Sequence, residues 1–502
     1  MNATEATPEV SGEKPERRLP WLERPHSGTT LILGLGLFFW LCFALAGTFS
    51  PPEERIEGVD PVAYYAWLRS LAFDHDLDFE NEYRALVPEE EALTKGSPVD
   101  PGGPRTATGR VPNAFSIGPA ILWAPFVAAG HFAATMGGIP ADGYSQPYHT
   151  AVFLANIVYG TAGALLVFAA LRARWDRRTS SLAAIGAWAC SPALYYAYAQ
   201  EAMAHACSFF AMALFLCAWL RLRKFETVWG WALIGGSLGL AALVRWQNAM
   251  FAVIPAIDLL WKTDRNKLAR LAVCGAAAAL VFSPQMAGWH VLYGSFVTIP
   301  QGPGFMTWFR PALVRVLFSA REGLFTWTPL MAMGVLGLFL WPEDDKKAYA
   351  AMAAAVLIQV YITACAGDTG WSFGMRRLVN CTPFFAVGLA TVLSRYRTAR
   401  PRWAGLVIAV CAAWNALFVM QYAGLLDTLY INKALQTVSE QHHVPVDTLA
   451  SMSTLPDGTP FDAEEFARNH RFPRDSAPTL RQFIPDKLTV LVVFVRRVLA
   501  WR

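Results

Sequence analysis

The stretch GVDPVAYYAWLRSLAFDHDLDFENEY (residues 58–83) follows the first long apolar run of the chain and begins with an isolated carboxylate, Asp60. Its segment YYAWLRSLAF has the composition of a helix that lies at a membrane surface, with aromatic rings at headgroup depth. Across residues 50–113 there are thirteen acidic and six basic residues. These features predict a large polar loop that is anchored to a membrane by interfacial helices.

The composition of the whole chain fits this reading. The 502 residues are 54% hydrophobic and only 16% charged, with a mean hydropathy of +0.31, whereas an ordinary soluble domain has about 25% charged residues. The net charge is +4, too small to indicate a nucleic-acid partner. The eight cysteines lie mostly within apolar runs, as small hydrophobic residues do. The sequence therefore predicts an all-α polytopic membrane protein.

About eleven apolar runs are long enough to be transmembrane helices. Residues 1–28 before them are polar and proline-rich and are expected to form a cytoplasmic tail. The last run is followed by a polar tail, residues 424–502, which is expected to be extracytoplasmic and whose segment 488–500 could form a membrane-associated helix. The expected spans are 29–49, 149–171, 180–197, 203–220, 228–244, 247–261, 268–289, 323–341, 348–365, 377–394 and 403–423.

Lysine and arginine are distributed unequally between the two sets of short loops. One set contains seventeen of them and the other six, so the positive-inside rule places the amino terminus in the cytoplasm and residues 50–148 outside. Residues 114–136 are apolar enough to span, but a span there would invert every later loop. We expect a helix that lies in or re-enters the outer leaflet, and a true span with a compensating missed helix stays open. A bacterial inner membrane is the expected location.

Several polar residues on the outer side are candidates for a site. Asp60 could accept a proton from an alcohol beside the membrane, unless it only solvates the loop. Tyr64 and Tyr65 are its expected pocket neighbours, and Asp78 and Glu82 belong to an acidic cluster that could ligate a metal.

Two further groups interrupt apolar runs. Glu201 and His205 are four residues apart and would share one face of a helix, which suits a shared proton or cation as well as a structural hydrogen bond. GDTGWSFGMRRL (367–378) and RWQN (245–248) supply the basic residues Arg376, Arg377 and Arg245, which suit a lipid phosphate or, alternatively, headgroup snorkelling. Trp371 could stack on a sugar ring.

These elements resemble the GT-C superfamily of integral membrane glycosyltransferases. The order of spans and loops is similar to that of the protein O-mannosyltransferases and the lipid A aminoarabinose transferase, and the resemblance covers roughly residues 29–423. It implies that the early outer-loop carboxylate, Asp60, is the catalytic base. Two departures stand out: Pro61 follows Asp60 where the O-mannosyltransferases have an acidic pair, and the oligosaccharyltransferase motif WWDYG is absent.

The resemblance implies an inverting hexosyl- or pentosyltransferase that uses a polyprenyl-phosphate sugar as co-substrate. The acceptor would be a glycan, a lipid or a protein hydroxyl at the extracytoplasmic face, and a divalent cation remains an option. Two other classes stay open. A transporter or flippase of lipid-linked glycans would need charges deep within the spans, and an acyltransferase or polymer ligase would need another base, for which His205 and Glu201 are candidates.

Overall fold

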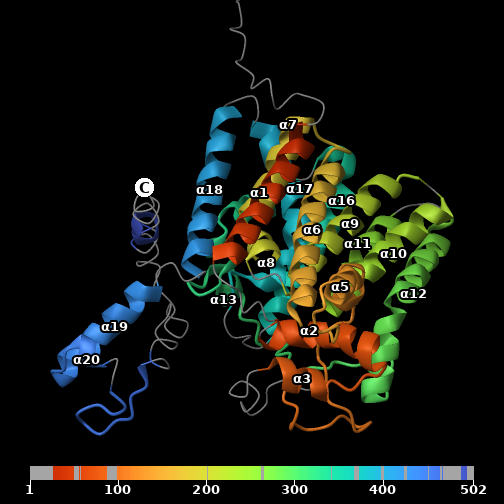
Figure 1. The fold of residues 1–502 in the computed structure, drawn as a ribbon. Coiled ribbons are helices and arrows are strands. Elements are labelled where there is room, and N and C mark those ends of the chain that lie inside the picture. The colour runs from red at the N-terminus through yellow and green to blue at the C-terminus, as the bar shows by residue number, and fades with distance from the viewer. Residues whose placement is uncertain are drawn as a thin grey trace, which may run out of the picture.

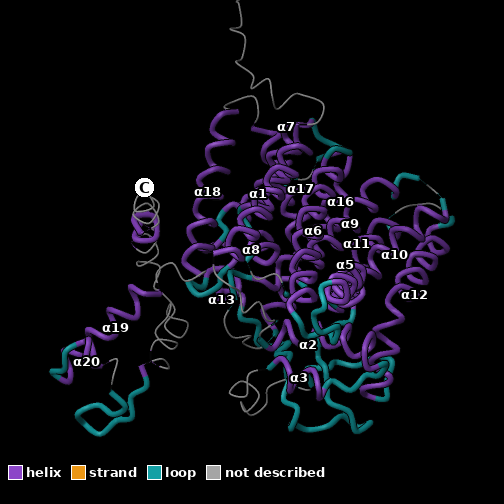
Figure 2. The backbone as a smooth tube through the Cα atoms, in the orientation of Figure 1, coloured by secondary structure: helices purple, strands orange, loops and turns teal. Residues whose placement is uncertain are grey.

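The computed structural model describes most of the chain and shows a bundle of helices (Figure 1). Within the described part, β-pairing is limited to two isolated bridges, Met306–Ala366 and Thr454–Pro460, and the rest is helix and loop (Figure 2). The prediction of an all-α chain is confirmed. The described residues are 27–49, 56, 58–87, 99–199, 202–225, 227–261, 265–302, 304–340, 342–366, 372–396, 401–422, 427–449, 452–463, 466, 485 and 488–493.

Long apolar helices make up the bundle. Seven segments of the described chain are long and apolar enough to cross a membrane, so the chain is an integral membrane protein. Their apolar side chains face either each other or the bundle surface, as expected where lipid replaces water. The long helices are α1 (Ser27–Phe49), α5 (Gly118–Met136), α6 (Gln146–Leu171), α9 (His205–Leu222), α10 (Val228–Val244), α12 (Lys267–Tyr293), α16 (Lys346–Cys365), α17 (Thr382–Tyr396) and α18 (Pro401–Tyr422).

Three of the runs expected as single spans are divided. The first becomes α7 (Arg177–Ala189) and α8 (Pro192–Tyr198), and the second begins as the 3-10 helix η3 (Trp246–Ala252) before α11 (Val253–Leu260). The third becomes α14 (Leu324–Trp327) and α15 (Leu330–Leu338). Proline starts α8 and precedes α15, and a proline has no N–H to continue the preceding helix. Window averages of hydropathy do not register such breaks.

The first loop forms a layer of short helices across one end of the bundle. Helix α2 (Val59–Arg69) continues into a π-helical turn, η2 (Ser70–Asp74), and then α3 (Glu80–Leu86) follows. Figure 1 shows α2 running crosswise below α6, with α3 beneath it. This is the arrangement expected of interfacial helices.

Side chains fix α2 to the loops around it. Trp67 Nε1 donates to the Phe115 carbonyl at 3.0 Å, and Asn113 Nδ2 donates to the Ala63 carbonyl at 2.8 Å. Asn113 is fully buried. Because buried polar groups are nearly always hydrogen-bonded, this contact fixes the rotation of α2 about its axis and therefore which of its faces points into the bundle.

Helix α5 forms most of residues 114–136, the segment for which the sequence left open whether it spans the membrane. Its length and composition would allow it to span. In Figures 1 and 2, however, it is seen nearly along its axis, whereas α6 and α12 run lengthwise. That crosswise course favours the prediction that α5 lies along the membrane, which stays a prediction.

The remaining features add little to the site. The seven cysteines whose side chains the structure describes are free, and six of them are buried. In the tail, α19 (Asp427–His442) and α20 (Val446–Leu449) lie beside the bundle in Figure 1. The short helix α13 (Leu313–Phe318) lies between α12 and α14 in sequence.

Candidate functional site

An ion pair joins the start of α2 to the start of the 3-10 helix η5 (Arg376–Cys381). Arg376 Nη1 lies 3.1 Å from Asp60 Oδ2, and both side chains are mostly buried, at 14% and 26% exposure. Each residue is reached through a glycine with left-handed backbone two positions earlier, Gly58 (φ 87°) and Gly374 (φ 56°). Other residues rarely adopt that conformation, so the two turns that present the pair depend on glycine.

Tyr64 stands one helical turn beyond Asp60 on α2. It interacts electrostatically with Asp60, Arg245 and Arg376, and its ring meets Phe115 edge-on at 5.0 Å between centroids. Burial raises the pKa of Tyr64 to about 12. At neutral pH the phenol therefore keeps its proton and can donate a hydrogen bond to a substrate oxygen.

His205 and Arg245 form the next layer of the group. Arg245 Nη1 and His205 Nδ1 are 3.3 Å apart, and since guanidinium is only a donor, Nδ1 accepts and the ring proton sits on Nε2. The His205 ring lies against Tyr196, with centroids 4.4 Å apart. Electrostatically, His205 is also affected by Arg376 and Arg377.

Arg377 completes the basic group from the other side of η5. Its guanidinium lies over the Phe305 ring, 5.6 Å from the centroid, and its electrostatic neighbours include Arg245, Arg376 and the buried carboxylate of Glu322. Glu322 Oε2 accepts a hydrogen bond from Ser372 Oγ at 3.1 Å.

The charges of this group do not balance among the described residues. Arg245, Arg376 and Arg377 interact with one another, and the carboxylates near them are Asp60 and Glu322. Arginine presents several N–H donors in a planar fork that matches phosphate oxygens. The arrangement is suited to an anion bound beside a carboxylate.

Three residues expected in the pocket lie elsewhere in the outer loop. Tyr65 Oη donates to the Gly143 carbonyl at 2.7 Å, and Asp78 lies near Arg105 at 4.0 Å on the surface. Glu82 is fully buried and pairs with Arg69 at 3.1 Å. Burial raises the pKa of Glu82 to about 7. The structure thus places Glu82 in a packing contact between α2 and α3, away from the Asp60 group.

Glu201 and Trp371 lie outside the described residues, so their positions stay predictions. Within the part of the chain that the structure describes, no three His, Cys, Asp or Glu side chains stand close enough together to hold a metal ion.

Sequence reasoning missed four residues of the group. Tyr196 Oη accepts a hydrogen bond from the Phe373 N–H at 3.0 Å and packs against His205, while Phe305 lies on Arg377. Asn248 and Asn380 are hydrogen-bonded to each other at 2.7 Å. The motif RWQN did contain Asn248, but only the fold brings Asn380 to it.

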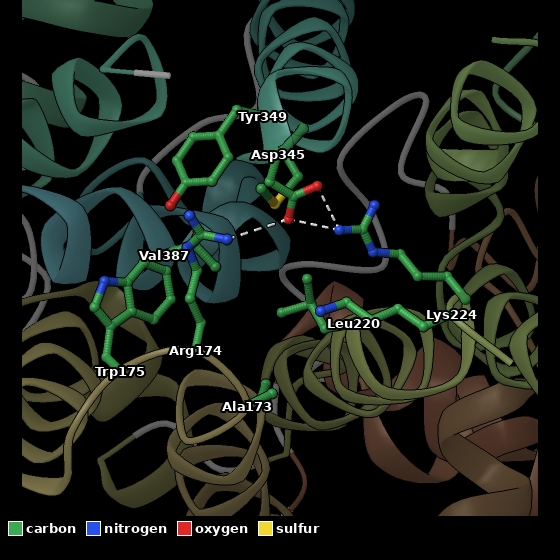
Figure 3. Close-up of a pocket in the computed structure, with 11 residues that line it drawn as sticks. Ala173, Arg174, Trp175, Leu220, Lys224, Asp345, Tyr349 and Val387 are labelled. Carbon is green, nitrogen blue, oxygen red and sulfur yellow. Dashed lines mark hydrogen bonds and ion pairs between the residues drawn. The ribbon is translucent and has the colours of Figure 1, made fainter. Parts of the chain in front are cut away.

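A small pocket lies at the opposite end of the bundle. It has a volume of about 40 Å³, room for a few water molecules. Figure 3 shows Arg174 pointing toward Asp345, with Tyr349 beside them. Helix α9 begins at His205 in the site and has 18 residues, so this pocket is roughly 27 Å away.

Ion pairs fill this second region. Arg223 Nη2 lies 2.5 Å from both carboxylate oxygens of Asp345, and Arg223 Nη1 lies 3.3 Å from Asp258. Arg174 pairs with Asp344 at 2.7 Å. Arg174 and Arg223 each have a carboxylate partner, so these ion pairs stabilise the packing of the helix ends, and the region is not a candidate anion site.

Comparisons with known proteins give structural neighbours alone. No family model matches the sequence, and no curated protein matches it. The ArnT structure from Cupriavidus metallidurans bound to undecaprenyl phosphate is 14% identical, with a TM-score of 0.47, and the alignment covers 95% of this chain and 72% of that one. The apo ArnT structure is 12% identical, with a TM-score of 0.45, covering 92% and 76%. At this degree of likeness, the function has to be argued from the residues of this chain.

Proposed function

We propose that this chain is a GT-C-type glycosyltransferase that moves a sugar from a polyprenyl-phosphate donor to an acceptor hydroxyl. The observation that carries the proposal is the Asp60–Arg376 contact within a half-buried group of three arginines. A transferase of this kind needs a base for the acceptor and cations for the departing phosphate, side by side. Asp60, the residue predicted to be the base, is in contact with Arg376, one of the residues predicted to bind the phosphate.

In the proposed reaction, Asp60 accepts the proton of the acceptor hydroxyl as its oxygen attacks the anomeric carbon. The new bond joins that carbon to the acceptor oxygen, and the bond to the phosphate oxygen breaks with its electron pair leaving on the phosphate. The sugar passes through an oxocarbenium-like state. One displacement inverts the anomeric configuration.

The arginines stabilise the charge that gathers on the departing phosphate. Arg377 and Arg245 would hold it, while Arg376 contacts Asp60 and can reach a second anion through its other donors. Tyr64, with its protonated phenol, would bind a sugar or phosphate oxygen.

The membrane geometry fits a lipid-linked donor. His205 begins a candidate span and Arg376 begins another, so the arginines lie at the level where a lipid phosphate sits. The distribution of basic loops supports a position of this end outside the cytoplasm. Glu201 and Trp371 are proposed to border the Asp60–Arg376 site, because they are close in sequence to His205 and Ser372.

The test is sugar transfer in reconstituted membranes, with polyprenyl-phosphate hexoses and pentoses as donors. Wild type should transfer at least one sugar, and Asp60→Asn should lower turnover by about 10²- to 10⁴-fold, the usual contribution of a general base. Arg84→Ala is the control, because Arg84 is 63% exposed on α3 and pairs with its neighbour Glu80. Undiminished transfer by Asp60→Asn would refute the assignment of the base.

A further inference from the structure

Two arginines of the site belong to the same short motif. Residues 245–248 read Arg-Trp-Gln-Asn and residues 377–380 read Arg-Leu-Val-Asn, so each arginine is followed three positions later by an asparagine. Both asparagines lie in 3-10 helices, η3 and η5. Arg377 and Asn380 both lie in η5, where side chains three residues apart stand on one face, whereas Arg245 has an extended backbone and immediately precedes η3. In the first motif, the Asn248 N–H also donates to the Arg245 carbonyl at 2.8 Å.

The two asparagines bind each other. Asn380 Nδ2 donates to Asn248 Oδ1 at 2.7 Å, and their side chains are buried, at 1% and 0% exposure. Asn248 Nδ2 in turn donates to Ser208 Oγ at 3.2 Å and to the Ala241 carbonyl at 2.9 Å. The pair therefore ties η5 to η3, and η3 to α9 and α10.

Each asparagine of this contact follows, by three residues, one of two like charges, Arg245 and Arg377. Arg245 is the largest electrostatic neighbour of Arg377, and the two repel each other. Two cations that bind one anion repel each other when they are brought close together. Either the fold holds them close before the anion binds, or the free energy of binding has to offset this repulsion. A hydrogen bond between η3 and η5, three residues along the chain from each arginine, is placed to hold them close.

An apolar contact lies close by, between η3 and α17, the helix that directly follows η5. Phe251 and Phe384 stack with ring centroids 5.1 Å apart and planes 7° apart, one turn beyond the asparagines. Replacing both partners of a buried hydrogen bond by apolar groups of the same shape can leave stability nearly unchanged. We therefore expect the amides at positions 248 and 380 to fix the relative orientation of η3 and η5 more than to stabilise their contact.

We propose that the Asn248–Asn380 pair is a positioning clasp that sets the separation of Arg245 and Arg377 for one phosphate group. This inference rests on the proposed function and deepens it. Neither asparagine is a catalytic residue, since each acts through the arginine three positions before it.

The test measures binding of undecaprenyl phosphate to the purified full chain in detergent, together with sugar transfer and thermal unfolding. Asn380→Ala should raise the Kd about tenfold, which is about 1.4 kcal/mol. In an Arg377→Lys background the same change should raise the Kd less than twofold, since the clasp acts through Arg377. Asn248→Ala combined with Asn380→Ala should weaken binding no more than either change alone.

The matched control is Phe384→Leu, which loosens the same interface without touching the amides. It should lower the unfolding temperature and leave the Kd within twofold. An Asn380→Ala effect of equal size in both backgrounds would overturn the clasp, and so would an unchanged Kd in Asn380→Ala.

The outcomes separate the two proposals. Wild type that binds undecaprenyl phosphate but transfers no sugar would refute the proposed function, and the Kd values would still decide the clasp. Wild type that binds no undecaprenyl phosphate would overturn both.

Discussion

Neutralising Asp60 should affect binding and turnover in opposite directions. Asp60 lies 3.1 Å from Arg376, in a group that is proposed to receive a phosphate. The Asp60→Asn variant loses the proton acceptor, so sugar transfer should fall by about 10²- to 10⁴-fold. It also loses the carboxylate that lies beside Arg376, so a phosphate near that arginine should be attracted more strongly.

The gain in binding can be estimated from the geometry. A phosphate on the other side of the Arg376 guanidinium would lie roughly 7 Å from the Asp60 carboxylate, and Coulomb repulsion at an effective dielectric constant of about 20 to 40 is about 1.2 to 2.4 kcal/mol. Removal of that repulsion tightens binding about 8- to 60-fold. This range of dielectric constant suits a carboxylate that is mostly buried but still 26% exposed.

The assay titrates radiolabelled undecaprenyl phosphate against wild type and Asp60→Asn in the same detergent, at two salt concentrations. Tighter binding should be most visible at low salt, since ions screen charges near the surface. Weaker binding by Asp60→Asn would refute the reasoning, because it would mean that the carboxylate organises the arginines instead of competing with phosphate. The control is Asp78→Asn, which removes a carboxylate from the surface of the same loop.

Three more changes test other parts of the molecule. Arg376→Lys should lower turnover on the order of tenfold, because lysine is a point charge and cannot hold a carboxylate and a phosphate in one planar fork; unchanged turnover would contradict this. Asp345→Asn should lower the free energy of unfolding by about 2 kcal/mol, less than the full cost of breaking a buried pair because Asp345 is 16% exposed, while sugar transfer stays unchanged. Glu82 should make stability fall as pH rises from about 4.5 to about 7, because its pKa is raised on folding and the folded state binds more protons in that range; Glu82→Gln should remove this slope in thermal unfolding measured from pH 4.5 to 8.

The sequence predicted the class of fold and the chemistry of individual residues, but not their contacts. Twenty-residue apolar runs identify spans because the thickness of the bilayer sets their length. Asp60 and Arg376 were each predicted from their position beside the membrane. That they touch depends on how η5 reaches the start of α2, and no local pattern contains that information.

For Glu82, the environment in the structure differs from the one that the sequence suggested. Its acidic neighbours made it look like a solvated or metal-binding carboxylate, yet it is buried against Arg69. A carboxylate and an arginine thirteen positions apart carry no periodic signal, so the pair could not be read from the sequence.

The broken spans account for most of what the sequence missed. Three runs with uniform apolar composition contain breaks, and two runs have a 3-10 turn at the site end. One of these turns carries Asn248 and follows directly after Arg245, and the other carries both Arg377 and Asn380. In an α-helix, residues three apart diverge by about 60° around the axis, whereas in a 3-10 helix they align. Non-α backbone at membrane depth is tolerated where it lines a cavity or is buried in protein. A polar pair spaced by three at the end of an apolar run is therefore a sequence pattern worth weighing as a site, because an ordinary span would gain nothing from it.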